Sequence, residues 1–75
     1  MDREFYTTDR EIEILNLIVL GLSNSQIAAK IFVSTHTVKA HLGNLYKKFH
    51  VYNRVQLVIV CVKHGIIDIK NHNND

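Results

Sequence analysis

The chain has 75 residues, no proline and only three glycines, and 47% of its residues are hydrophobic while 8% are aromatic. This composition favours one small helical domain and argues against a disordered or low-complexity chain. The single cysteine excludes an internal disulfide, the polar N-terminal segment is not a signal peptide, and no apolar run approaches the roughly 20 residues that cross a bilayer. We therefore expect a soluble cytoplasmic protein with no membrane association.

The charges are distributed unevenly, although the net charge is only +2. All seven acidic residues lie in the two ends of the chain, at 2–13 and 68–75. Residues 14–67 contain six basic residues and no acid, hence a charge of +6 with histidine neutral: Lys30, Lys39, Lys47, Lys48, Arg54 and Lys63. A basic middle suits a polyanionic partner, and the alternative is a chance excess of lysine on a solvated surface.

The first helix is predicted to follow a short lead-in at residues 1–7. Thr8 and Glu11 form the T-x-x-E pattern of a capping box, and Gly21 is placed to end the helix. Its second half is rich in leucine, isoleucine and valine. We expect it to be largely buried and to serve as scaffold.

A second helix is predicted to begin at Ser23, because Gln26 completes another capping box. Ile27, Ala28 and Ile31 form its inner face. Its first residues offer hydroxyl, amide and backbone N–H groups that can hold a phosphate, and plain capping is the alternative: Ser23, Asn24 and Ser25. The turn that follows, Phe32-Val33, is expected to pack both side chains inward.

The third helix, capped by Ser34, has one face that is clearly apolar. Val38, Leu42, Leu45 and Phe49 recur at helical spacing and should enter the core. The opposite face and its flanks carry small and polar residues: His36, Thr37, Lys39, Ala40, Gly43, Asn44, Lys47 and Lys48. A glycine inside a helix costs about 1 kcal/mol, so close approach of a partner is one reason for Gly43. An ordinary solvated face is the other interpretation.

A last helix is predicted over roughly 54–64, capped by Asn53 and ended by Gly65. The run VQLVIVCV could also be a strand, but a lone strand would have no partner. With Leu57, Val58 and Cys61 facing the core, an apolar strip with polar edges points outward, where it suits a two-fold dimer: Val55, Gln56, Ile59, Val62 and Lys63. A fully buried helix is the alternative. Ile66, Ile67 and Ile69 should tuck back, and residues 68–75 should form a frayed polar tail.

Motifs along residues 7–67 are together highly specific. They are Thr8-x-Arg10-Glu11-x-Glu13-Ile14-Leu15, Gly21-x-Ser23-Asn24-x-x-Ile27-Ala28, Ser34-x-x-Thr37-Val38-Lys39-x-His41-x-x-Asn44, Lys48-Phe49-x-Val51, Asn53-Arg54 and Gly65-Ile66-Ile67. This pattern resembles the LuxR/GerE-type DNA-binding domain. The resemblance implies a four-helix domain of bacterial transcription regulators, whose third helix enters the major groove and whose fourth often dimerises.

By position, the resemblance makes Lys39 and Ala40 base-reading residues. It makes Thr35, Thr37, Lys47 and Lys48 phosphate-contacting or flanking ones. The chain departs from the family at Thr7, Asp9 and Gly43, and a glycine at the last position implies fewer base contacts. Family members often carry a receiver or ligand-binding domain before this module, so the chain is either a stand-alone regulator or an excised domain.

We therefore predict an all-α, four-helix bundle with a central helix-turn-helix at residues 8–67. The expected function is a sequence-specific, dimeric regulator of transcription that binds double-stranded DNA. RNA polymerase or an upstream regulatory domain are further candidate partners. The competing hypothesis is a protein-interaction module that binds another regulator or RNA polymerase. The histidines and Cys61 lack metal-ligand spacing, and no phosphate loop or nucleophile motif is present, so we expect no metal, no cofactor and no enzyme. The full set of predicted DNA-binding residues is Ser23, Asn24, Ser25, Ser34, Thr35, His36, Thr37, Lys39, Ala40, Gly43, Asn44, Lys47 and Lys48.

Overall fold

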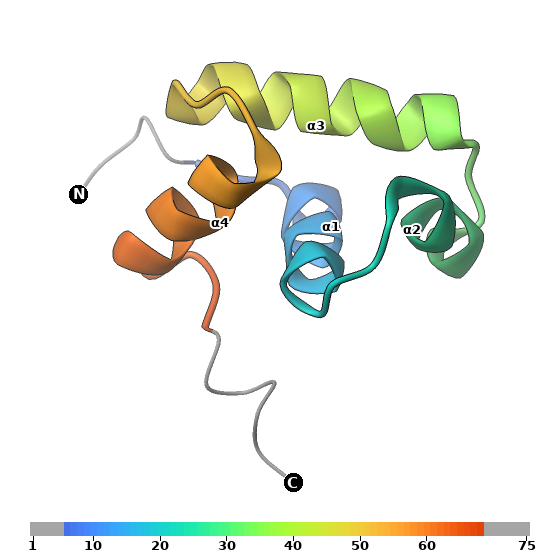
Figure 1. The fold of residues 1–75 in the computed structure, drawn as a ribbon, viewed down its shortest axis with the longest axis horizontal. Coiled ribbons are helices and arrows are strands. Elements are labelled where there is room, and N and C mark those ends of the chain that lie inside the picture. The colour runs from blue at the N-terminus through green and yellow to red at the C-terminus, as the bar shows by residue number, and fades with distance from the viewer. Residues whose placement is uncertain (1–5, 69–75) are drawn as a thin grey trace, which may run out of the picture.

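The computed structural model describes residues 6–68, which form four helices and no strand. The helices are α1 (Asp9–Val19), α2 (Asn24–Ile31), α3 (Thr35–Phe49) and α4 (Arg54–Lys63). The longest, α3, lies along one side of the molecule, with α1 and α4 beneath it and α2 at one end (Figure 1). The all-α fold is confirmed, and the ambiguous run in α4 is a helix. Residues 1–5 of the expected lead-in, residues 69–75 of the expected tail and the packing of Ile69 lie outside the described residues.

Each helix begins where its capping residue predicts. In all four cases a side-chain oxygen of the cap accepts a hydrogen bond from the backbone N–H three residues later, which satisfies one otherwise unpaired donor. The pairs and their distances are Thr8 and Glu11 at 3.1 Å, Ser23 and Gln26 at 3.2 Å, Ser34 and Thr37 at 3.0 Å, and Asn53 and Gln56 at 2.9 Å. Both capping boxes expected from the sequence are confirmed, in α1 and α2.

The helices end in two different ways. Gly21 and Gly65 follow α1 and α4 with φ of 92° and 72°, a left-handed conformation that glycine adopts without steric cost. Phe32 and His50 adopt the same conformation after α2 and α3, with φ of 62° and 59°. A side chain there costs roughly 1–2 kcal/mol, so the neighbouring packing must hold these two turns in place.

The core lies where the four helices meet. It contains the predicted face of α3, the inner face of α2, and Leu57 and Cys61 of α4, together with residues of α1. Ile67 is also buried, which confirms that the segment after α4 folds back. The buried apolar residues are Ile14, Leu15, Ile18, Ile27, Ala28, Ile31, Val38, Leu42, Leu45, Phe49, Leu57, Cys61 and Ile67. Burial raises the pKa of the Cys61 thiol to about 11, as expected for a cysteine that acts as a small apolar core residue.

The prediction that Phe32 packs inward is wrong. Its side chain is 93% exposed, whereas Val33 is partly buried against the core. The physical reason is the left-handed backbone at Phe32, which reverses the chain and turns only the following side chain toward the core. Over the described range, none of the helices is long and apolar enough to cross a membrane.

Candidate nucleic-acid interface

The outer side of α3 carries the predicted DNA-binding residues away from the core. The four apolar residues of α3 are buried, and this fixes the helix so that the opposite side faces solvent. Along that side, Thr35, Thr37, Gly43 and Lys48 are partly buried, and the others are exposed: Ser34, His36, Lys39, Ala40, Asn44 and Lys47. The predicted orientation of this face is confirmed. The role of each side chain toward DNA stays a prediction.

Two hydroxyl groups at the start of α3 already have internal partners. Ser34 Oγ accepts a hydrogen bond from the Thr37 backbone N–H at 3.0 Å and lies 3.0 Å from Thr37 Oγ1. These bonds close the first turn of α3. Any contact of Ser34 or Thr37 with DNA would have to share hydrogen-bonding capacity with this cap.

Gly43 is not required by the fold. Its φ is not positive, and a Cβ atom built at this position would have no heavy atom within 4 Å apart from its own helix and chain neighbours. The missing side chain therefore neither relieves a clash nor permits an unusual turn. Gly43 and the exposed Ala40, one turn earlier, therefore leave the middle of the outer face without long side chains.

Lys48 is held by α1. Its ammonium donates a hydrogen bond to Glu11 Oε1 at 2.6 Å, and the same oxygen accepts from the Thr8 backbone N–H at 3.0 Å. Burial by itself would raise the pKa of Glu11, but the hydrogen bonds from Lys48 and Thr8 and the nearby positive charges lower it. Sequence reasoning placed Lys48 among the phosphate-contacting residues. It missed this pair because its members are 37 residues apart and share no local spacing.

The beginning of α2 is also tied to another helix. Asn24 Oδ1 accepts a hydrogen bond from Arg54 Nη2 at 2.6 Å, and Arg54 Nη1 donates to the Leu22 carbonyl at 2.7 Å. Ser23 is used as the cap, whereas Ser25 is exposed. Arg54 was not among the predicted site residues. The only signal in the sequence was its place in the Asn53-Arg54 motif.

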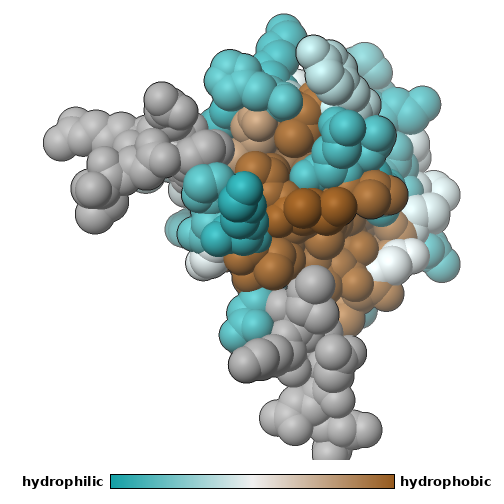
Figure 2. All heavy atoms as spheres, turned by 60° about the vertical axis from the view of Figure 1, so that its left-hand side comes forward, coloured by the Kyte–Doolittle hydropathy of each residue, from teal (hydrophilic) through white to brown (hydrophobic). Residues whose placement is uncertain are grey.

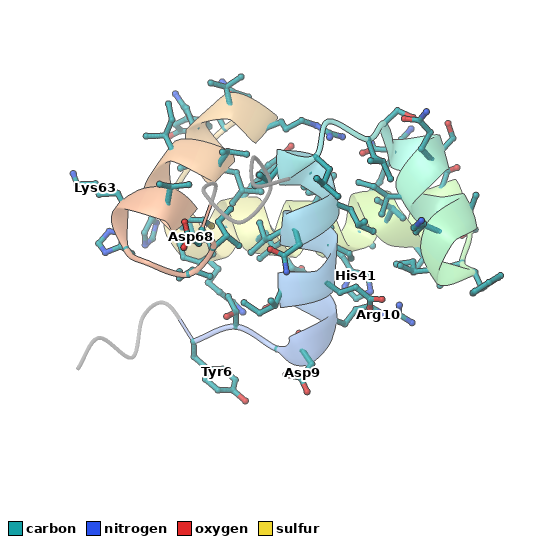
Figure 3. All side chains as sticks on the ribbon, turned by 90° about the horizontal axis from the view of Figure 1, so that it is seen from below. Tyr6, Asp9, Arg10, His41, Lys63 and Asp68 are labelled. Atoms are coloured by element: carbon teal, nitrogen blue, oxygen red, sulfur yellow. The ribbon has the colours of Figure 1, made fainter. Side chains whose placement is uncertain are left out.

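The fold thus separates the basic residues of the middle of the sequence into two groups, one with internal hydrogen bonds and one exposed to solvent. Lys48 and Arg54 make internal hydrogen bonds, whereas Lys39 and Lys47 are exposed on α3 and Lys30 on α2. Lys63 projects outward from the end of α4 (Figure 3). The described residues bring together no group of three or more His, Cys, Asp or Glu that could hold a metal ion.

The outer face of α4 forms an apolar surface. Val55 is 68% exposed and Ile59 is 60% exposed. Val62, near the end of the helix, is partly buried and packs against the core. Gln56 and Lys63 are exposed at its edges, as predicted. Figure 2 shows apolar residues gathered on the side of the molecule where α4 lies. The outward orientation is confirmed for Val55, Gln56, Ile59 and Lys63 but not for Val62, which packs partly against the core, and dimerisation stays a prediction.

Residues 7–61 match the family model described as bacterial regulatory proteins, luxR family. The chain belongs to this family. Family membership assigns this domain to the DNA-binding domains of transcription regulators, which are not enzymatic domains. The LuxR-type helix-turn-helix expected from the sequence motifs is confirmed.

Curated relatives of this LuxR-family chain are bacterial regulators. It is 55% identical over 51 residues to the CsgBAC operon transcriptional regulatory protein of Escherichia coli, covering 68% of this chain and 24% of the relative. It is 49% identical over 53 residues to the nitrate/nitrite response regulator protein homolog of Haemophilus influenzae, covering 71% and 26%. It is 43% identical over 60 residues to the response regulator VraR of Staphylococcus aureus, covering 80% and 29%. The chain spans about a quarter of the length of these relatives.

A solved structure shares the fold. The response regulator ChrA of a heme-sensing two-component system superposes with a TM-score of 0.81 and 44% sequence identity. The match covers 83% of this chain and 31% of ChrA. In ChrA, the domain that matches this chain is therefore one part of a longer regulator.

Proposed function

We propose that this LuxR-family domain binds specific sequences of double-stranded DNA, with α3 in the major groove and two copies associated through α4. The observation that carries the proposal is the outer face of α3, where exposed polar and basic side chains surround a centre formed by the small residues Ala40 and Gly43. B-DNA's major groove admits a helix, and such a centre lets the helix backbone approach the base edges.

Lys39 is the residue best suited to read a base. It is exposed on the second turn of α3, beside Ala40, and a lysine ammonium donates well to the acceptor atoms of guanine in the major groove. Ala40 offers a methyl group that packs against the methyl group of thymine. His36 and Asn44 extend the same face toward neighbouring base pairs.

Phosphate contacts would flank this centre. Lys47 supplies an exposed positive charge on the outer face of α3, and Thr35 lies at its first turn. The first turn of α2, where Ser25 is exposed, offers backbone N–H groups and the positive end of the helix dipole. These contacts position the domain on DNA, whereas the contacts of Lys39 and its neighbours provide the sequence preference.

The apolar strip of α4 suits a second copy of the chain. A two-fold axis through this strip would bring Val55 and Ile59 against the same residues of the other copy and remove them from water. The two α3 helices would then read half-sites about 10 bp apart or a near multiple of that spacing.

The proposal is tested by replacing Lys39 with alanine and measuring binding to a preferred duplex and to duplexes with single base changes. We expect Lys39→Ala to lose discrimination at one base position, by about 1–3 kcal/mol. Lys30→Ala is the matched control, because it removes an equal charge from the exposed last turn of α2 and should leave discrimination unchanged. Equal weakening on every sequence would make Lys39 a phosphate contact and contradict its base-reading role.

A second candidate function follows from the exposed apolar strip. The same strip of α4 could bind another regulator, RNA polymerase or an upstream regulatory domain, without sequence preference of the domain itself. Absence of binding to duplex DNA of mixed sequence at low salt would favour this interaction module.

A further inference from the structure

Arg54 joins the start of α4 to residues 22–24, which lie 32 to 30 residues earlier in the sequence. It is the first residue of α4, and its guanidinium reaches the Leu22 carbonyl in the loop between α1 and α2 at 2.7 Å. A second nitrogen of the same group donates to Oδ1 of Asn24, the first residue of α2, at 2.6 Å. Both Arg54 and Asn24 are partly buried. The start of the helix-turn-helix is therefore attached to the start of α4.

The planar guanidinium makes this attachment rigid. Its donors lie in a fixed fork, so two simultaneous hydrogen bonds define both the position and the orientation of the groups that accept them. Because Asn24 Oδ1 is one of these acceptors, that oxygen is directed at Arg54. The exposed residues of the first turn of α2 are Ser25 and Gln26 instead.

We infer that Arg54 is a positioning residue for DNA binding, which places the first turn of α2 for its contact with a DNA phosphate, and that Asn24 acts through Arg54 rather than on DNA. This inference rests on the function proposed above. It also connects the two parts of that function, since Arg54 belongs to the helix proposed to dimerise. In a dimer, the same hydrogen bonds would hold each α2 against the α4 of its own copy.

A double-mutant cycle on DNA affinity tests the inference. The variants are Arg54→Met, Asn24→Ala and the double variant, measured on the duplex preferred by the unmodified chain and well below the unfolding temperature of each. We expect Arg54→Met to weaken binding about tenfold, and the double variant to bind within about twofold of Arg54→Met alone, because both changes remove the same attachment. Independent, multiplying losses would show that Asn24 contacts DNA directly and would overturn the inference.

Salt dependence separates positioning from direct contact. A phosphate-contacting arginine contributes about −0.9 to the slope of log affinity against log salt, so its loss would flatten the slope by that amount. We expect Arg54→Met to retain the slope of the unmodified chain, and Arg54→Lys, which keeps one donor, to recover part of the affinity. A flattened slope, or unchanged affinity in Arg54→Met, would overturn the inference.

Two controls complete the experiment. Arg10→Met removes an arginine charge from the exposed side of α1, outside both proposed contact surfaces, and should leave affinity unchanged, whereas an equal loss in Arg10→Met and Arg54→Met would reduce the effect to net charge and overturn the positioning role. If Arg54→Met does not fold, the cycle is measured with Arg54→Lys. Failure of the proposed function itself is distinguishable, because the unmodified chain would then show no preferred duplex.

Discussion

The Lys48 ammonium and Glu11 Oε1, 2.6 Å apart, join the last turn of α3 to the first turn of α1. Glu11 is 7% exposed and also completes the capping box of α1 with Thr8. One carboxylate therefore caps the scaffold helix and holds the end of the helix proposed to enter DNA. This arrangement gives adjacent lysines on α3 different roles.

We predict that Lys47 and Lys48 differ in their effects on DNA binding and stability. Lys48→Met should lower the free energy of unfolding by about 1–3 kcal/mol, because it leaves a largely buried carboxylate without its charged partner. Lys47→Met removes an exposed charge, should leave stability nearly unchanged, and should flatten the salt dependence of DNA binding by about 0.9 in slope. Chemical denaturation and salt titration of both variants measure these effects. If the slope of log affinity against log salt flattened in Lys48→Met instead, Lys48 would be a phosphate contact.

The pair of Lys48 and Glu11 also predicts how the free energy of unfolding changes at acidic pH. The pKa of Glu11 in the folded protein lies below its ordinary value of 4.5, so folding favours the ionised carboxylate. Its contribution is present above about pH 4.5 and is lost as the pH falls through the lower pKa of the folded state. We expect the stability difference between the unmodified chain and Glu11→Gln to shrink over that range in denaturation curves taken at several pH values. A difference that grows on acidification would contradict the lowered pKa.

Gly43→Ala should separate stability from DNA binding. The added methyl group enters open space on a helix, so we expect the free energy of unfolding to rise by about 1 kcal/mol. DNA affinity should fall if the base edges approach the helix at this point, as the proposed function requires. Thermal unfolding and DNA titration of one variant measure both effects. Unchanged or tighter DNA binding in the stabilised variant would show that the DNA does not approach Gly43.

Ile59→Asp should disrupt association through α4. A carboxylate in the middle of the apolar strip would lose its hydration in a two-fold contact. It would also lie close to the equivalent carboxylate of the second copy, and the two negative charges would repel each other. We expect fewer dimers in sedimentation equilibrium and loss of cooperative binding to paired half-sites, with binding to one half-site retained. Leu20→Asp is the control, because Leu20 is 52% exposed and lies outside α4. Equal behaviour of the two variants would contradict a dimer formed by α4.

The features that could be predicted from the sequence depend on local patterns. All four helix starts follow from caps such as Ser34 and Asn53, whose hydrogen bonds span only three residues. The buried and outer faces of α3 follow from the spacing of its apolar residues, and the outward strip of α4 from the same reasoning.

The features that were missed depend on distant residues or on a single backbone angle. Nothing near Lys48 or Asn24 in the sequence indicates that their partners are Glu11 and Arg54, which become neighbours only when the helices pack. The exposure of Phe32 depends on one left-handed residue, whereas its apolar character favoured burial. Sequence patterns therefore located the outer face of α3, and the fold determined which of its cations are exposed.

The most direct test of the proposed DNA recognition is selection of bound duplexes from a pool of random sequence, at near-physiological salt. We expect enrichment of an inverted repeat whose halves lie about 10 bp apart or a near multiple of that spacing. No enriched sequence, with binding that disappears as salt rises, would contradict the claim that this chain reads DNA sequence.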